Sequence, residues 1–128
     1  MKIIIHDYAG YTFPAQLSRQ LAARGHIVKF LYAGYNNAPK GDLTLKRTDP
    51  KTLSFEPIYT RKILEKYNFS KRWLQEREYG QLLAQRIIEF QPDILISSDT
   101  PLDAQRAAWR ASKECGAVII FWLQDVIG

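Results

Sequence analysis

Polar and aromatic side chains that could do chemistry follow directly after three apolar runs of the sequence. They lie in residues 6–11 (HDYAGY), residues 97–100 (SSDT) and residues 124–125 (QD). A carboxylate in such a place can orient a hydroxyl group or act as an acid or base, and a tyrosine offers a flat apolar face with a hydroxyl tip. The candidate ligand-binding residues are Asp7, Tyr8, Gly10, Tyr11, Asp99, Thr100 and Gln124, and the candidate catalytic residue is Asp125.

The glycine content of the first segment limits what it can bind. It contains Gly10 alone, so the three-glycine cradle of a dinucleotide site is missing, and no G-K-[ST] phosphate loop occurs in the chain. Gly10 still allows a positive φ, or the close approach of a ligand, beside a helix N-terminus that favours anions. Each segment also has a purely structural interpretation. Tyr8 and Tyr11 could pack over the edge of the sheet, and Asp99 and Thr100 could cap a helix. Asp125 could form a salt bridge.

The periodicity of the apolar residues predicts the elements that position these segments. Continuous apolar runs predict strands at residues 2–6, 27–33, 93–98 and 117–123, and a short additional strand is predicted at 43–47. Helical spacing predicts helices at 12–24 and 71–90. Thr100, Pro101 and Asp103 form a capping-box pattern, which opens a further helix that ends at Gly116. The strand at 117–123 is so apolar that we expect it to be buried.

Strands that alternate with helices predict an α/β fold, here a Rossmann-like, mostly parallel sheet with helices on both faces. The length of 128 residues predicts a single domain, residues 1–128. In such sheets ligands bind at the carboxyl ends of the strands, where all three candidate segments fall.

The cysteine content of the chain indicates which cellular compartment suits the protein. Cys115 is the only cysteine, so no internal disulfide can form and a cytoplasmic compartment fits. We expect its thiol to be inert, because no histidine lies near it in the sequence.

His6 and His26 do not form a metal-binding pair, and we expect neither a metal nor a cofactor. No apolar stretch approaches the roughly 18 residues of a membrane-spanning helix.

A basic zone lies in the middle of the chain. Residues 40–78 hold ten Lys or Arg against six Asp or Glu, within a net charge of +5 for the whole chain. Its basic residues alternate with aliphatic and aromatic ones in a pattern typical of an interfacial segment. The alternative is a solvated face over packed apolar residues. The candidate membrane or acceptor surface comprises Arg61, Lys62, Lys66, Lys71, Arg72 and Trp73.

Three segments together resemble a known family. HDYAGYTFPAQLSRQLAARGH, PDILISSDTPLDAQ and FWLQDV, in this order, are similar to the N-terminal half of bacterial family 4 glycosyltransferases, which have the GT-B fold. The resemblance covers essentially the whole chain and is closest to the branch that builds capsule, O-antigen and other exopolysaccharides. It departs from the family at two places. Ala9-Gly10 stands where a glycine pair is common, and Gln124-Asp125 stands where many relatives have a histidine.

The resemblance implies an acceptor-side domain that faces a nucleotide-sugar domain across a cleft. The second domain lies outside this sequence, so we expect residues 1–128 to form an incomplete domain that is inactive alone. The complete enzyme would transfer a hexose, with retention of configuration, from a nucleotide sugar to a lipid-linked saccharide in surface polysaccharide synthesis. It would work in the cytoplasm, peripheral on the inner face of the membrane and in contact with anionic lipid. Asp125 would orient a hydroxyl group.

An alternative function is a non-catalytic Rossmann-like module that binds nucleotides or nucleic acid. The missing glycines disfavour the nucleotide version, and under the glycosyltransferase interpretation no nucleic-acid partner is expected. The nucleic-acid version would use the basic zone and would show a steep dependence of affinity on salt.

Overall fold

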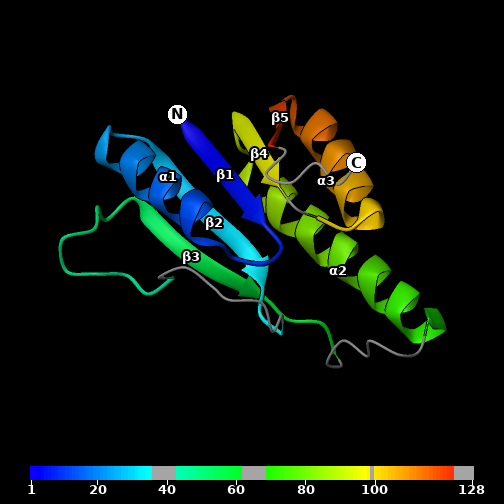
Figure 1. The fold of residues 1–128 in the computed structure, drawn as a ribbon. Coiled ribbons are helices and arrows are strands. Elements are labelled where there is room, and N and C mark those ends of the chain that lie inside the picture. Colours follow the sequence, from blue (N-terminus) through cyan, green and yellow to red (C-terminus); the bar gives the residue numbers. More distant parts are fainter. Residues whose placement is uncertain (36–42, 62–68, 99, 123–128) are drawn as a thin grey trace.

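The computed structural model describes residues 1–35, 43–61, 69–98 and 100–122. Within these ranges strands and helices alternate along the chain, except between the second and third strands (Figure 1). In order, the elements are β1 (Lys2–Asp7), α1 (Thr12–Ala23), β2 (Ile27–Ala33), β3 (Leu53–Ile58), α2 (Phe69–Phe90), β4 (Ile94–Ser98), α3 (Leu102–Cys115) and β5 (Val118–Trp122).

The five strands form one sheet in the order β3-β2-β1-β4-β5, and every pair of neighbours is parallel. The chain starts in the middle of the sheet, builds outward to β3, and then returns to build the other half from β4. The reversal falls between β1 and β4. This is the topological switch point, at which open α/β sheets bind ligands. The predicted α/β fold with a parallel sheet is therefore confirmed.

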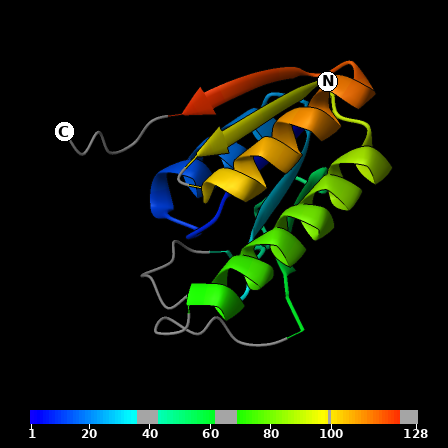
Figure 2. The same cartoon turned by 90° about the vertical axis from the view of Figure 1, so that its right-hand side faces the viewer.

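Helices cover both faces of the sheet (Figures 1 and 2). Because side chains alternate along a strand, the apolar run of β1 feeds two cores. Ile3 and Ile5 pack with α1 on one face, whereas Ile4 packs with α2 and α3 on the other. This two-sided burial is why β1 is a continuous apolar run and not an alternating one.

Small residues bring α2 and α3 together. A Cβ atom added to Gly80 of α2 would lie 3.2 Å from Cα of Ala104 and 3.3 Å from Cβ of Ala107, both on α3. The helix backbones therefore approach closely at this crossing, and the long side chains on either side of it are held on a rigid support.

The predicted strand at 43–47 is wrong. The third strand of the structure is β3, at residues 53–58, where the proline at position 57 obscured the strand pattern. In the preceding segment side chains bind the backbone groups that a strand would use. The Asp49 carboxylate accepts the backbone N–H of Lys46 at 2.8 Å, and Arg19 on α1 donates to the Thr44 carbonyl at 3.1 Å. Arg19 also pairs with Asp49 at 3.2 Å, so this segment is tied to α1.

The expectation that the last strand is buried is also wrong. β5 lies at the edge of the sheet, and within the described part of the chain only β4 pairs with it. Val118 is 61% exposed, and Ile120 and Phe121 are exposed as well. The apolar composition indicated a strand buried on both faces. At the edge of the sheet, Ile119 packs on the core that α3 helps to form, whereas Val118, Ile120 and Phe121 stay exposed.

Two details of helix termini also differ from expectation. The residue before the first turn of α3 is Pro101, with no side-chain capping bond, so Thr100 does not cap this helix. Phe13, Leu17 and Leu21 recur at four-residue spacing, which predicts one shared buried face of α1, but the Phe13 side chain is 70% exposed. The buried positions of α1 are instead Pro14, Ala15, Ser18 and Ala22.

Candidate functional site at the carboxyl edge of the sheet

Adjacent strands bring the first two candidate segments together. β1 and β4 pair in a register that sets His6 opposite Ser97 and Asp7 opposite Ser98. The Ser98 hydroxyl donates to Oδ1 of Asp7 at 3.0 Å. The segments at residues 6–11 and 97–100 therefore begin side by side at the carboxyl edge of the sheet. Among the other candidates, Asp99, Gln124 and Asp125 lie outside the described residues.

Asp7 organises the loop between β1 and α1. Its side chain is fully buried, and its Oδ2 accepts the backbone N–H of Tyr11 at 2.6 Å. The Gly10 N–H donates to the Asp7 carbonyl at 3.1 Å, which closes a tight turn in which Gly10 has φ 76°. A residue with a Cβ would be strained at this φ, so Gly10 is required by the turn. The carboxylate of Asp7 therefore shapes the loop from beneath and does not itself face solvent.

The two tyrosines of this loop are half-buried, so each keeps part of its surface available. The Tyr8 ring packs edge-on against Tyr79 of α2, with ring centroids 5.0 Å apart. Burial raises the pKa of the Tyr8 hydroxyl to about 12, with a further rise from Glu76 and an opposing effect of Arg72. At neutral pH the phenol is protonated and can donate a hydrogen bond. Tyr11 precedes α1 without making a side-chain capping bond.

A buried histidine lies beneath the loop. Nε2 of His6 is 2.7 Å from the Tyr79 hydroxyl, and Nδ1 is 3.1 Å from Oγ1 of Thr100 and 3.3 Å from Oγ of Ser97. The neighbouring hydroxyl protons are already used, because Thr100 donates to the Ser98 carbonyl at 2.7 Å and Ser97 donates to Oε1 of Gln105 at 2.6 Å. We therefore assign the proton of the neutral imidazole to Nδ1, with the Tyr79 hydroxyl donating to Nε2.

Burial keeps this imidazole neutral. His6 is fully buried, and desolvation lowers its pKa to about 3. The pKa of Tyr79 is raised well above its ordinary value, first by burial and then by Tyr8 and Asp7. Both groups therefore keep one protonation state at physiological pH. The network is a fixed scaffold, and Gln105 connects it to the surface.

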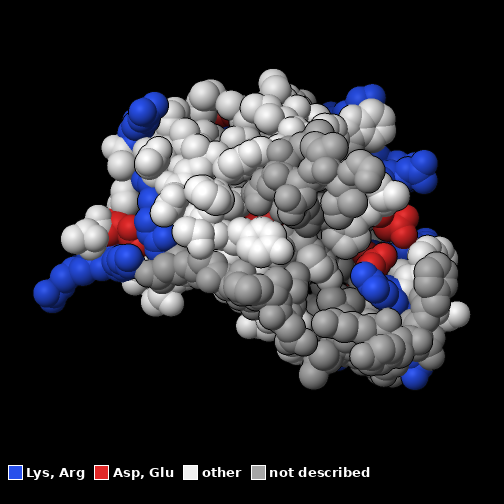
Figure 3. Space-filling model, in the orientation of Figure 1, with Lys and Arg blue, Asp and Glu red and all other residues white. Residues whose placement is uncertain are grey.

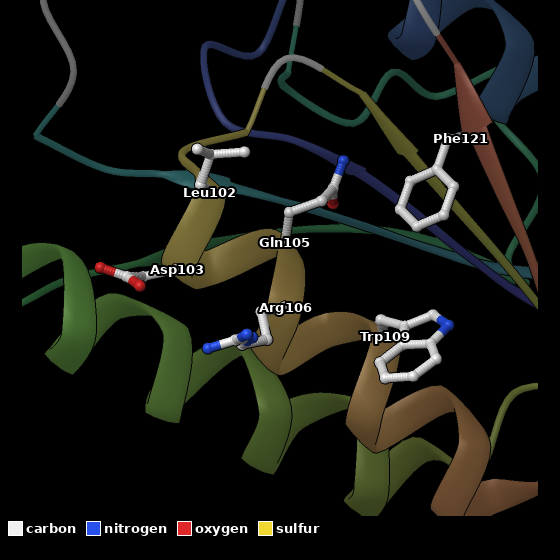
Figure 4. A pocket seen from close by; sticks show the side chains of 6 residues that line it. All are labelled: Leu102, Asp103, Gln105, Arg106, Trp109 and Phe121. Atoms are coloured by element: carbon white, nitrogen blue, oxygen red, sulfur yellow. The ribbon is translucent and has the colours of Figure 1, made fainter.

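An open hollow of about 580 Å³ lies beside this network, between α3 and the end of β5 (Figure 4). Trp109 and Phe121 supply aromatic walls. Gln105 supplies an amide, and Asp103 and Arg106 point toward α2. Flat aromatic faces beside hydrogen-bonding groups suit a sugar ring, which has apolar C–H faces and equatorial hydroxyl groups.

The candidate basic surface is only partly within the described residues, since Lys62 and Lys66 fall outside them. Arg61 pairs with Glu78 at 3.7 Å, and Arg72 with Glu76 at 3.2 Å within α2. These glutamates offset part of the positive charge. Exposed Trp73 and Leu74 lie next to these charges in the sequence, with Lys71, so an amphipathic surface is present at the start of α2.

Sequence reasoning missed four residues of this site: Tyr79, Gln105, Trp109 and Phe121. From the sequence, Tyr79 is only one apolar position in the helical spacing over 71–90, and Phe121 is only part of a strand expected to be buried. The one available signal is the position of Gln105, which lies eight residues after Ser97 in the first turns of a helix that starts at the carboxyl edge. Such positions face the ligand side in parallel sheets.

Within the described ranges, no cluster of three or more His, Cys, Asp or Glu side chains is arranged to hold a metal ion. No helix there combines the length and apolar character needed to span a membrane.

No protein-family model and no curated protein matches the sequence, whereas solved structures of similar fold exist. The C-terminal domain of a hydrogenase from Pyrococcus furiosus is 16% identical, with a TM-score of 0.63 over 94% of this chain and 89% of that one. UGT2 from Phytolacca americana, solved with UDP-2-fluoro-glucose and pterostilbene, is 16% identical with a TM-score of 0.63 over 95% of this chain.

This chain spans 30% of the length of that glycosyltransferase. A deacetylase of the teicoplanin biosynthesis pathway is 18% identical, with a TM-score of 0.56 over 96% of this chain and 67% of that one. At these identities the likeness shows the fold alone. The fold is a Rossmann-like α/β fold, which the hydrogenase domain and UGT2 share with this chain to the same extent.

Proposed function

We propose that this domain is the acceptor-side half of a retaining hexosyltransferase that builds surface polysaccharide. The acceptor is a lipid-linked saccharide, and the donor is a nucleotide sugar held mainly by a second Rossmann-like domain. The fold supports this, because it matches half of a GT-B enzyme. A hydrogenase domain is as similar in structure as UGT2 is, so the fold alone does not indicate a glycosyltransferase. The proposal must therefore rest on the residues of the site.

The observation that carries the proposal is the hollow between α3 and β5. It opens at the carboxyl edge, where α/β sheets bind ligands, and combines Trp109 and Phe121 with hydrogen-bonding groups. A saccharide could stack on the two rings while Gln105 donates through its amide nitrogen. The amide is oriented for this, because its Oε1 already accepts from Ser97. The buried network thus fixes one recognition group of the hollow.

The remaining residues have complementary roles in this proposal. Tyr8, Gly10, Tyr11 and Thr100 form the rim that faces the donor sugar across the cleft. In a retaining transfer positive charge develops on the sugar ring and negative charge on the leaving diphosphate. The amino end of α1 favours that negative charge. Asp125 would orient a hydroxyl of the donor or acceptor.

The proposed role of Asp125 is testable in the enzyme joined to its donor domain. Asp125→Asn should lower turnover by about 10²–10³, the usual cost of one transition-state interaction, with little change in melting temperature. A large fall in melting temperature with unchanged turnover would make Asp125 a structural residue.

The start of α2 is the proposed contact with the membrane. Basic residues near an anionic leaflet add about 1 kcal/mol each, and aromatic rings favour the interface. The domain should therefore co-sediment with phosphatidylglycerol vesicles in a salt-sensitive way. Exchange of Lys62, Lys66, Lys71 and Arg72 for Gln should reduce this binding while the fold is retained. If both proteins bind alike, the surface is not a membrane contact.

Calorimetry tests the proposed acceptor site directly. Amphiphilic alkyl hexosides, as mimics of the acceptor, should bind this domain more tightly than UDP- and GDP-sugars do. Trp109→Ala should abolish hexoside binding. Ile88→Ala is the control, because Ile88 is an exposed apolar residue of α2 that does not line the hollow. Micromolar binding of nucleotide sugars, without hexoside binding, would favour a nucleotide-binding module instead.

A further inference from the structure

Three arginines line a second groove, which lies between α2 and α3. Arg77 comes from α2, and Arg106 and Arg110 come from α3. The groove has a volume of about 360 Å³, and its other lining residues are Trp73, Gln81, Asp103 and Ala107. Figure 3 shows Lys and Arg side chains projecting at the edge of the molecule beside α3.

Among the residues that the structure describes, the arginines of α3 have no counter-ion. Within the described part of the chain, no carboxylate lies within ion-pair distance of Arg106 or Arg110, in contrast to Arg61, Arg72 and Arg86, which each pair with a glutamate. Arg106 and Arg110 are four residues apart on one helix face. Like charges at this spacing slightly destabilise a helix. An anion between them would remove that repulsion.

The support beneath the arginines is rigid. Gly80, Ala104 and Ala107 bring the two helices into close contact, so the arginines of both helices converge on one groove. Arg77 is further held by the Trp73 ring, whose centroid lies 5.0 Å from its guanidinium carbon. Guanidinium groups suit phosphate because their planar donors can bind two oxygens at once.

We propose that this groove binds a phosphate group that carries two or more negative charges, such as a diphosphate. Three guanidinium groups exceed what a singly charged anion needs, and Asp103 at the rim offsets only one of the three positive charges. This groove adjoins the sugar-binding hollow, with which it shares Asp103 and Arg106, but phosphate binding there does not depend on transferase activity. Since the arginines are exposed, the affinity for a small phosphate compound should be modest, about 0.1–1 mM at low salt.

Calorimetry with inorganic pyrophosphate tests the proposal. Exchange of Arg77, Arg106 and Arg110 for Gln should weaken binding by about tenfold or more, the loss expected for charge-assisted bonds. The matched control removes three exposed charges elsewhere: Arg24, Arg47 and Lys51, each changed to Gln. It should bind nearly as the wild type does. Equal weakening in both variants would show an unspecific response to net charge and would overturn the proposal.

A second pair of variants tests the groove in the opposite direction. Asp103→Asn should tighten pyrophosphate binding, because it removes a carboxylate from the groove, whereas Glu89→Gln on the exposed face of α2 should not. Vesicles of phosphatidic acid, whose monoester phosphate can carry two negative charges, with phosphatidylcholine as control, distinguish a lipid source of the phosphate from a soluble one. Binding to either probe that is lost in the groove variant supports the site. Absence of binding to both probes would overturn it.

Discussion

The hydroxyl of Tyr79 lies 2.7 Å from Nε2 of His6, and both side chains are buried. This contact joins the middle of α2 to the end of β1, 73 residues earlier in the chain. It orients a neutral imidazole beneath the β1–α1 loop. Through Ser97 the same network reaches Gln105 at the wall of the hollow, so core packing and the proposed recognition of a sugar are physically connected.

The stability of the domain should fall in mild acid because of His6. Its pKa is about 3 in the folded state and about 6.5 when unfolded, so the unfolded chain binds more protons between these values. The full contribution is present above about pH 6.5 and is lost as the pH falls. Between about pH 7 and about pH 4.5 the loss from this group should be about 2–3 kcal/mol, measured by urea unfolding. His6→Gln should be less stable at neutral pH but show a shallower pH dependence. An unchanged slope in that variant would exclude His6 as the cause.

Tyr79→Phe should destabilise the domain by about 1–3 kcal/mol, because it leaves the buried Nε2 of His6 without its donor. Tyr8→Phe is the matched control. The Tyr8 ring packs against Tyr79, but its half-buried hydroxyl can be solvated, so its loss should cost much less. Urea unfolding of both variants gives the comparison. Equal losses would mean that ring packing, and not the hydrogen bond, dominates.

Asp7→Ala should cost about 2–4 kcal/mol, because the backbone N–H of Tyr11 and the hydroxyl of Ser98 both lose their acceptor. Asp7→Asn should cost less, since its amide oxygen can still accept the Tyr11 N–H. Hydrogen exchange at the Tyr11 amide reports on the loop itself. We expect fast exchange in the Ala variant and retained protection in the Asn variant. Retained protection in both would show that the loop does not depend on this side chain.

Gly80→Val should weaken the crossing of α2 and α3. Even a single added Cβ would lie 3.2 Å from the Ala104 backbone, and the two further methyl groups of valine have no free space there. The expected cost is about 2 kcal/mol or more. Phosphate binding in the arginine groove should weaken as well, because the helices must separate. A variant with wild-type stability would contradict the close approach of the helices.

Much of the fold could be predicted from the sequence because its signals are local. The apolar runs of β1, β2 and β4 and the helical spacing of α2 depend only on neighbouring residues, and the parallel topology follows from their alternation. The edge position of β5 could not be predicted, because exposure depends on which element lies over a strand. β3 was missed because its proline resembles a loop signal, although an edge strand tolerates it.

The site was predictable only in part, because its contacts join residues that lie far apart in the sequence. Asp7, Tyr8, Gly10, Tyr11 and Thr100 were identified from their position after strands. Their individual contacts were not, since the buried Asp7 and the network around His6 depend on partners from α2, β4 and α3. The role of Thr100 was predicted as a helix cap, whereas its hydroxyl contacts the histidine. Tyr79 and Gln105 have helical patterns that give no indication of a partner across the sheet.

The measurement that tests the central claim most directly is an NMR titration of this domain with an alkyl hexoside. Binding in the hollow predicts saturable shifts of the Trp109 indole N–H and the Gln105 side-chain amide. The backbone amide of Ile88, on α2 and away from the hollow, should stay unchanged. The same experiment with Trp109→Ala should show no saturable shifts. Shifts confined to the Tyr11 and Thr12 amides, or shifts that appear only with nucleotide sugars, would contradict an acceptor site between α3 and β5.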